Sequence, residues 1–251
     1  MRICFSMNPP ENVAAGGGAK FVLGFKSFLQ KKGHKVEFGL NVHDLPDLIF
    51  MFDPRYLNYS RNLITIDHIR YLQDALKVNI PIIHRINDIG PPKDRPVDYV
   101  SNMLELSNRS SFAVYISNWV KEYYQNKGNI ATEAVVVYNG VDRSVFYPKE
   151  HNLGDKIKLV SHHWSSNYLK GWDIYNQLDE WVGRQKNIEF TFIGNLAKDA
   201  NLKNTKVIPP MYGEEMASEI RKNDIYVTAS RFEPCGMHHI EGIACGLPIL
   251  Y

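Results

Sequence analysis

Strand-length apolar runs alternate with helix-spaced apolar patterns along nearly the whole chain, and this alternation restricts its fold more than any other feature. Residues 2–7 form an apolar run of strand length, residues 19–32 carry apolar side chains at helical spacing, and residues 35–40 begin a second strand. Strands that alternate with helices predict a parallel, doubly wound α/β sheet. Further strands are predicted at 47–52, 80–84, 112–116 and 132–138, and helices at 65–78, 97–108 and 119–127.

The pattern restarts after the polar, irregular stretch that ends at residue 156. We therefore expect two α/β domains, residues 1–149 and 150–251. The last run, 246–251, begins a strand and then the chain stops, so we expect the second domain to be incomplete. In this half, strands are predicted at 157–161, 188–193, 206–208 and 225–229, and helices at 172–184, 213–222 and 237–245.

The composition excludes several classes of protein. A formal net charge of +2 with 22% charged residues does not produce the basic field of a nucleic-acid-binding protein. Three cysteines without Cys-x-x-Cys spacing favour neither a disulfide framework nor a zinc site, and indicate a reducing compartment. The sequence contains no run of about 18 apolar residues and no signal-like leader. We therefore expect a cytoplasmic protein.

One stretch carries the chemistry expected of a ligand site. Glu233 lies in a loop that follows a strand predicted to be buried, and a helix is predicted to begin directly after Gly236. Open α/β sheets bind ligands at this place, where the N–H groups of a helix start attract an anion. Glu241 lies about one turn inside the helix. Two exposed acids without a function are the alternative, but the pairing suits a ligand with both phosphate and hydroxyl groups.

The segment Glu-Pro-Cys-Gly-Met-His-His-Ile-Glu at 233–241 resembles the Glu-x7-Glu signature of retaining, nucleotide-sugar-dependent glycosyltransferases. These have two Rossmann-like domains that face a central crevice (the GT-B type), and the similarity is to glycosyltransferase family 4. The segment Asn-Gly-Val-Asp at 139–142 with Phe-x-Pro at 146–148 also resembles this family. The resemblance implies transfer of a sugar with retention of anomeric configuration, without a metal or other cofactor.

The resemblance also implies roles for residues of the second domain. Glu233 would contact the donor sugar and Glu241 the nucleotide ribose. The backbone amides of Gly236, Met237 and His238 would face the sugar and the phosphates.

Lys170 precedes a predicted helix in a Lys-Gly-x-Asp pattern that resembles the family's diphosphate-binding lysine. A fixed positive charge is needed there, because negative charge develops on the departing diphosphate as the glycosidic bond breaks. Many relatives carry an arginine just before this lysine, whereas residues 162–169 contain none. A solvated turn lysine is the alternative.

In the first domain, Gly17 and Gly18 follow the first strand, where glycine lets a backbone approach a phosphate or sugar closely. A flexible turn explains them equally well. His84 ends a predicted strand, and the resemblance implies contact with the donor sugar. The alternative is a core histidine.

The predicted function is a retaining hexosyl- or glycosyltransferase that moves a sugar from a nucleoside-diphosphate sugar to a sugar or lipid-linked acceptor. A non-catalytic subunit that binds a nucleotide sugar or a partner is the main alternative, and a sugar-nucleotide epimerase is another. Residues 19–32 contain lysines and three phenylalanines and could contact a membrane. We expect this helix to pack on the sheet instead.

Overall fold

The computed structural model describes residues 1–11, 16–52, 63–89, 98–128, 133–150 and 153–251. The chain divides into two compact units. The first contains Met1–Glu11 and Gly18–Asn139, and the second contains Gly140–Tyr251, with Gly17 assigned to it.

The first unit is built on a parallel sheet with strand order β2-β1-β3-β4-β5-β6. Its strands are β1 Arg2–Phe5, β2 Lys35–Phe38, β3 Leu48–Met51, β4 Ile82–Ile86, β5 Phe112–Tyr115 and β6 Ala134–Val136. Its helices are α1 Gly17–Lys31, α2 Ile66–Arg70 with a π-helical continuation at Tyr71–Ala75, α3 Tyr99–Arg109 and α4 Asn118–Gln125.

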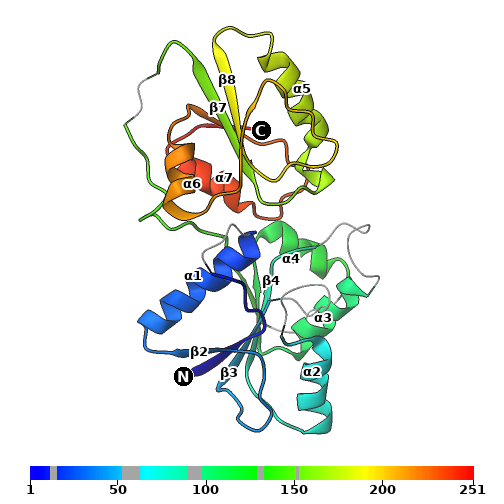
Figure 1. The fold of residues 1–251 in the computed structure, drawn as a ribbon. Helices are drawn as coiled ribbons and strands as arrows, with labels where there is room; N and C mark the ends of the chain where they lie inside the picture. The colour runs from blue at the N-terminus through cyan, green and yellow to red at the C-terminus, as the bar shows by residue number, and fades with distance from the viewer. Residues whose placement is uncertain (12–15, 53–62, 90–97, 129–132, 151–152) are drawn as a thin grey trace. The chain divides into compact units, whose positions relative to one another are not determined.

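Both faces of the central strands β1, β3 and β4 are buried, because alternate residues of these strands enter different cores. On β1, Phe5 packs with Val22 of α1, whereas Cys4 packs with residues of α2 and α3 such as Ile69 and Leu106. Helix α1 thus covers one face, and α2 and α3 cover the other (Figure 1). The ring of Phe25 stacks on Phe5 at 5.8 Å between centroids, so the apolar side of α1 packs on the sheet as expected.

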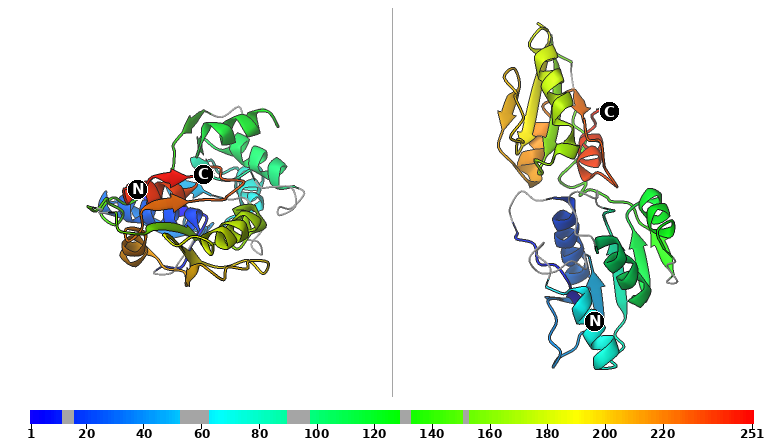
Figure 2. Two further views of the ribbon diagram at one scale, coloured as in Figure 1. Left: turned by 90° about the horizontal axis from the view of Figure 1, so that it is seen from above. Right: turned by 90° about the vertical axis from the view of Figure 1, so that its right-hand side faces the viewer.

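The second unit is a parallel sheet with strand order β11-β10-β7-β8-β9. Its strands are β7 Ile157–His163, β8 Ile188–Gly194, β9 Lys206–Ile208, β10 Ile225–Val227 and β11 Ile249–Leu250. Its helices are the 3-10 turn Tyr168–Lys170, α5 Trp172–Val182, α6 Gly213–Ile220 and α7 Met237–Ala244. Helix α5 packs on one face, and α6 and α7 pack on the other (Figure 2).

The second unit begins ten residues earlier than the expected boundary at 149/150, since the structure changes unit at Asn139/Gly140. Phe146 is buried in the core of the second unit, and Val141 and Val145 pack against that core. The guanidinium of Arg221 also donates to the carbonyl oxygen of Val145 at 2.9 Å. The Asn-Gly-Val-Asp turn therefore leads directly into the second unit.

Most predicted elements lie within a few residues of the observed ones, and two differ. Strand β7 continues beyond residue 161 to His163. The helix predicted at 65–78 changes to a π-helix and ends at Ala75, shortly before Lys77, whose left-handed backbone (φ 55°) is incompatible with a continuing helix. Ser117 caps the helix at 118–125, because its Oγ accepts from the N–H of Val120 at 3.2 Å.

Candidate functional site

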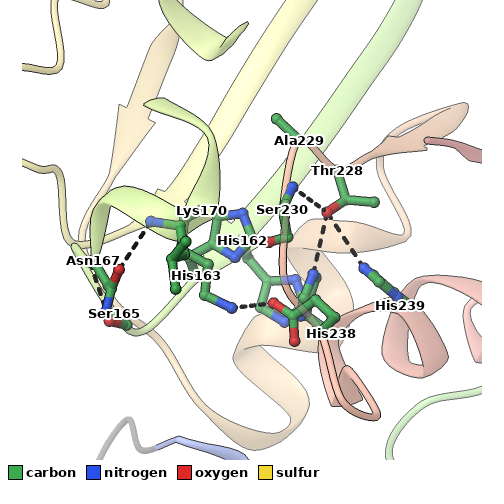
Figure 3. Close-up of polar contacts among 12 residues, drawn as sticks. His162, His163, Ser165, Asn167, Lys170, Thr228, Ala229, Ser230, His238 and His239 are labelled. Carbon is green, nitrogen blue, oxygen red and sulfur yellow. Dashed lines mark hydrogen bonds and ion pairs between the residues drawn. The ribbon is translucent and has the colours of Figure 1, made fainter. Parts of the chain in front are cut away.

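The candidate site of the second unit lies at the carboxyl ends of β7 and β10, which are neighbouring parallel strands. His162 and His163 end β7, and the segment after β10 leads through Glu233 to the start of α7. Parallel strands bring their carboxyl ends to one edge, which is where open α/β sheets bind ligands. The side chains from these three elements meet there (Figure 3).

A glycine allows the turn that carries Lys170 to reach this edge. Gly171 has φ 76°, and a Cβ at this position would lie 2.0 Å from the carbonyl oxygen of Ala229. The N–H of Arg231 donates to the carbonyl oxygen of Leu169 at 2.9 Å. The backbone before α5 therefore lies directly against the backbone after β10, and only glycine fits at the contact.

Lys170 and Glu233 form an ion pair in which Nζ donates to Oε1 (Figure 3). The two side chains are largely buried, with 19% and 13% of their surfaces exposed. His238 Nδ1 lies 3.9 Å from the same carboxylate oxygen. The structure thus brings together two of the residues that the sequence assigned to the donor, and it pairs their charges.

Glu241 lies on the second turn of α7 and is 1% exposed. Its Oε2 atom lies 2.7 Å from Nε2 of His162, whose Nδ1 lies 3.0 Å from the hydroxyl of Tyr226. The carboxylate therefore lies in the same unit as Glu233, at the buried side of α7.

Gly236 is the N-cap of α7 and has no side chain that could cap the helix. A Cβ at this position would lie 3.1 Å from Glu233 Oε2 and 3.2 Å from ring carbons of His238 and His239. Glycine keeps this crowded start open. The first helical residues are Met237 and His238, and their amides belong to the end of the helix that attracts anions.

Four histidines line this edge of the sheet. The ring centroids of His238 and His239 are 4.0 Å apart, and those of His163 and His238 are 4.8 Å apart. Both α7 histidines lie 3.3 Å from the hydroxyl of Thr228 on the segment after β10. His163 Nε2 lies 2.6 Å from the hydroxyl of Tyr175. These contacts tie α7, β7 and α5 to the end of β10.

Burial favours the neutral form of His163, His238 and His239. Burial lowers the pKa of His163 and of His238 well below the ordinary value, and nearby Lys170 and the neighbouring histidines lower both further. Burial also lowers the pKa of His239, although Glu233 opposes the shift. These histidines therefore do not add to the positive charge of Lys170 at neutral pH.

In the first unit, His84 is fully buried. Its Nδ1 lies 2.9 Å from Ser107 Oγ, and Ser107 Oγ donates to the carbonyl oxygen of Met103 at 2.8 Å. Nδ1 therefore carries the proton, and Nε2 is an acceptor with no hydrogen-bond partner among the described residues. Burial lowers the pKa of His84 to about 3.

Gly17 and Gly18 are the first two residues of α1. A Cβ on Gly18 would lie 3.7 Å from Asn87 Nδ2, an ordinary contact, so the space around it does not require glycine. His84 and Gly18 lie in the first unit, whereas Lys170, Glu233, Gly236, Met237, His238 and Glu241 lie in the second.

Sequence reasoning missed His162 and His163, because the strand was expected to end at residue 161. Two consecutive histidines that continue an apolar strand were the available signal. Within the described ranges, no group of three or more His, Cys, Asp or Glu side chains is arranged to hold a metal ion. Among the helices that the structure describes, none has the length and apolar character needed to cross a membrane.

Known proteins resemble the chain in sequence and in fold. Residues 173–251 match the family model of the glycosyl transferases group 1. This segment includes Glu233 and Glu241 but begins after Lys170. An uncharacterized glycosyltransferase of Methanocaldococcus jannaschii is 27% identical over 156 residues, which cover 57% of this chain and 40% of that protein.

Two solved structures have similar folds over 99% of this chain and 80% of their own. Sucrose-phosphate synthase from Thermosynechococcus elongatus superposes with a TM-score of 0.70 at 14% identity. HepE from Anabaena, solved in complex with UDP and glucose, has a TM-score of 0.69 at 15% identity. At these identities the likeness concerns the fold, and it agrees with two Rossmann-like units. The chain therefore has a GT-B type α/β fold, and its residues 173–251 match the glycosyl transferases group 1 model.

Proposed function

We propose that this chain moves a sugar from a nucleoside-diphosphate sugar to an acceptor, with retention at the anomeric carbon. The observation that supports this most is a convergence in the second unit. Lys170, Glu233, Glu241 and the start of α7 meet at the carboxyl edge of one sheet, and both glutamates lie in the segment that matches the family model.

The nucleotide is assigned to the second unit. Glu241 accepts hydrogen bonds from the ribose hydroxyls, while Lys170 and the amides of Gly236, Met237 and His238 bind the diphosphate. HepE and an alpha-glucosyltransferase with a similar fold were each solved with UDP. UDP-sugars are therefore the first donors to test.

The sugar is assigned to Glu233 and His84, and the acceptor to the side of Gly17 and Gly18. Nε2 of His84 has an unused lone pair among the described residues, which suits acceptance of a hydrogen bond from a sugar hydroxyl. Because this ring is fully buried, the assignment requires the residues around the end of β4 to move when the donor binds.

The reaction forms a bond between an acceptor oxygen and the anomeric carbon, and it breaks the bond from that carbon to the diphosphate. The acceptor hydroxyl proton ends on the released diphosphate, and the acceptor approaches from the face that the diphosphate leaves. Lys170 and the N-terminus of α7 stabilise the negative charge that develops on the leaving oxygen. The proposed acceptor is a sugar or is lipid-linked, and the proposed location is the cytoplasm. The proposed reaction uses no metal or other cofactor and no nucleic acid, and it does not require contact with a membrane.

The test is release of nucleoside diphosphate from a panel of nucleotide sugars, with and without glycan and lipid acceptors. We expect release from at least one donor that depends on an acceptor, and an α-linked product from an α-linked donor by NMR. A β-linked product from an α-linked donor would contradict retention. No release from any donor, together with no binding of UDP, GDP or ADP, would contradict the proposal as a whole.

A non-catalytic nucleotide-sugar-binding or partner-binding subunit is the second candidate. Two observations favour it. Lys170 is already paired with Glu233, and residues 162–169 contain no arginine that could supplement its charge. Donor binding in calorimetry without turnover, and without slow hydrolysis of the bound donor, would support this candidate.

A further inference from the structure

We infer that His162 is a positioning residue that fixes the carboxylate of Glu241 in the direction needed to select a ribose. The inference rests on the proposed function, because it concerns the glutamate assigned there to the nucleotide. The two residues are 79 positions apart in sequence, and their side chains meet inside the second unit.

The contact between His162 and Glu241 is short and buried. His162 Nε2 lies 2.7 Å from Glu241 Oε2, and the two residues are 3% and 1% exposed. A buried carboxylate that lacks a polar partner is strongly destabilising. The protein therefore keeps this contact formed, and the imidazole is one of the groups that fix how the carboxylate is rotated about its side chain.

Tyr226 in turn fixes the imidazole. Its hydroxyl lies 3.0 Å from His162 Nδ1 and accepts from the backbone N–H of His162 at 3.3 Å. Burial raises the pKa of Tyr226 well above its ordinary value, so the hydroxyl keeps its proton. A neutral ring with its proton on Nε2 satisfies both contacts, because it donates to Glu241 and accepts from Tyr226.

The backbone fixes the positions of the three hydrogen-bonded side chains of Tyr226, His162 and Glu241. Tyr226 and His162 come from the paired strands β10 and β7. A Cβ on Gly242 would lie 2.6 Å from the ring of Tyr226. The glycine lets α7 lie against that ring, which brings the adjacent Glu241 to the histidine. Two strands and one helix thus define the position of one carboxylate.

A carboxylate held in one orientation can accept hydrogen bonds from both vicinal ribose hydroxyls. Loss of the orientation weakens these two bonds and leaves the diphosphate contacts intact. The structural effect should therefore be seen in the ratio of affinities for a nucleoside diphosphate and its 2′,3′-dideoxy analogue, and not in affinity alone.

The experiment compares His162→Phe, His162→Gln and the exposed control His43→Phe. Calorimetry first identifies which of UDP, GDP and ADP binds most tightly to the wild-type protein. It then gives the dissociation constants of that nucleotide and of its 2′,3′-dideoxy analogue for each variant. We expect wild type and control to prefer the ribose form by about tenfold or more, equivalent to about 1.4 kcal/mol. His162→Phe should reduce the preference to about threefold or less, and His162→Gln, which keeps an N–H at similar reach, should largely restore it.

A folded His162→Phe variant with an unchanged preference would overturn the inference. If that variant does not fold, Tyr226→Phe replaces it, since it removes only the hydroxyl and should lower the preference by about twofold to fivefold. Glu241→Ala distinguishes failure of the positioning role from failure of the ribose assignment. If it abolishes the preference while the His162 variants keep it, the positioning role alone fails; if it leaves the preference intact, the ribose assignment in the proposed function fails.

Discussion

The Lys170 side chain is already engaged by Glu233, so both residues change environment when an anion reaches the start of α7. Replacement of Lys170 by Met removes a charge-assisted hydrogen bond to the diphosphate, a contact of about 1.5–3 kcal/mol. We therefore expect a loss of nucleoside diphosphate affinity of about 10-fold to 100-fold. Isothermal titration calorimetry measures it, with Lys198→Met at an exposed position as the matched control. Equal affinities in the two variants would contradict the assignment of Lys170.

Glu233→Gln should separate binding from turnover. The change releases Lys170 from its ion pair, so affinity for a free nucleoside diphosphate should rise by about fivefold, or ~1 kcal/mol. Turnover of the sugar donor should fall, because the carboxylate assigned to the sugar is lost. Parallel calorimetry and diphosphate-release assays check both effects. A parallel fall in affinity and turnover would show that Glu233 does not compete for Lys170.

His84 should make stability depend on pH. Its pKa of about 3 in the folded state lies below the unfolded value of about 6.5, so the unfolded state binds more protons at acidic pH. The stability is fully present above pH 6.5 and is lost as the pH falls toward 3, by roughly 2 kcal/mol at pH 5.

Denaturant unfolding at pH 7 and pH 5 measures this loss. His84→Asn keeps a donor for Ser107 and lacks the titration, so its loss of stability between the two pH values should be smaller by roughly 2 kcal/mol. The exposed His43→Asn is the control. Identical pH dependence in wild type and His84→Asn would contradict the expectation.

The sequence predicts which side chains lie close together where these side chains follow the ends of neighbouring strands. Glu233 and Glu241 were located by the strand–loop–helix order, and Lys170 by its position before a helix. The pairing of Glu241 with His162 was not predictable, because it joins residues 79 positions apart across a strand end that was placed two residues too early. Local periodicity carries no information on such a contact.

At the scale of elements, Gly171 sets how closely the 3-10 turn and the segment after β10 approach. Gly171→Ala places a methyl group against the carbonyl oxygen of Ala229 at a position with φ 76°, so the turn must move. We expect a loss of stability of more than about 1 kcal/mol and weaker diphosphate binding, because Lys170 moves with the turn.

Gly140→Ala is the matched control, since a Cβ there meets nothing within 4 Å. Thermal unfolding and calorimetry on both variants test the pair. Unchanged melting temperature and affinity in Gly171→Ala would show that the close approach is not needed.

The elements themselves were largely predictable, because buried parallel strands and amphipathic helices have distinct periodicities. The length of strand β7 was underestimated because His162 and His163 are polar residues in the buried part of the strand. The π-helical segment at Tyr71–Ala75 was also missed, because its apolar side chains fit an α-helical spacing equally well.

At the scale of the whole molecule, each unit has its own cores, and the segment from Gly140 belongs to the second. Phe146→Ala should destabilise the second unit by about 3–5 kcal/mol, because this side chain is buried among residues of β7, β8 and α6. Hydrogen exchange by mass spectrometry should show faster exchange in residues 157–251 only. Val137→Ala, at an exposed position, is the control, and faster exchange confined to the first unit would contradict the assignment of Phe146.

The two-unit α/β plan was predictable from the restart of the strand–helix pattern, whereas the unit boundary was not. Residues 140–149 lack regular periodicity, and their attachment depends on Phe146, Val141 and Val145, which pack with the core of the second unit. The roles of all the site residues remain predictions: Glu233, His84, Gly17, Gly18, Lys170, Gly236, Met237, His238 and Glu241.

The ion pair between Lys170 and Glu233 has a further consequence for ligand choice. A ligand must displace the carboxylate of Glu233 before it can bind Lys170. An anion that interacts only weakly with the lysine therefore cannot replace Glu233. Inorganic phosphate or a nucleoside monophosphate can present only one phosphate group in place of the carboxylate, whereas a diphosphate can engage the lysine with one phosphate and the start of α7 with the other. If the proposed function holds, the ion pair therefore favours a nucleoside diphosphate over small anions with a single phosphate group.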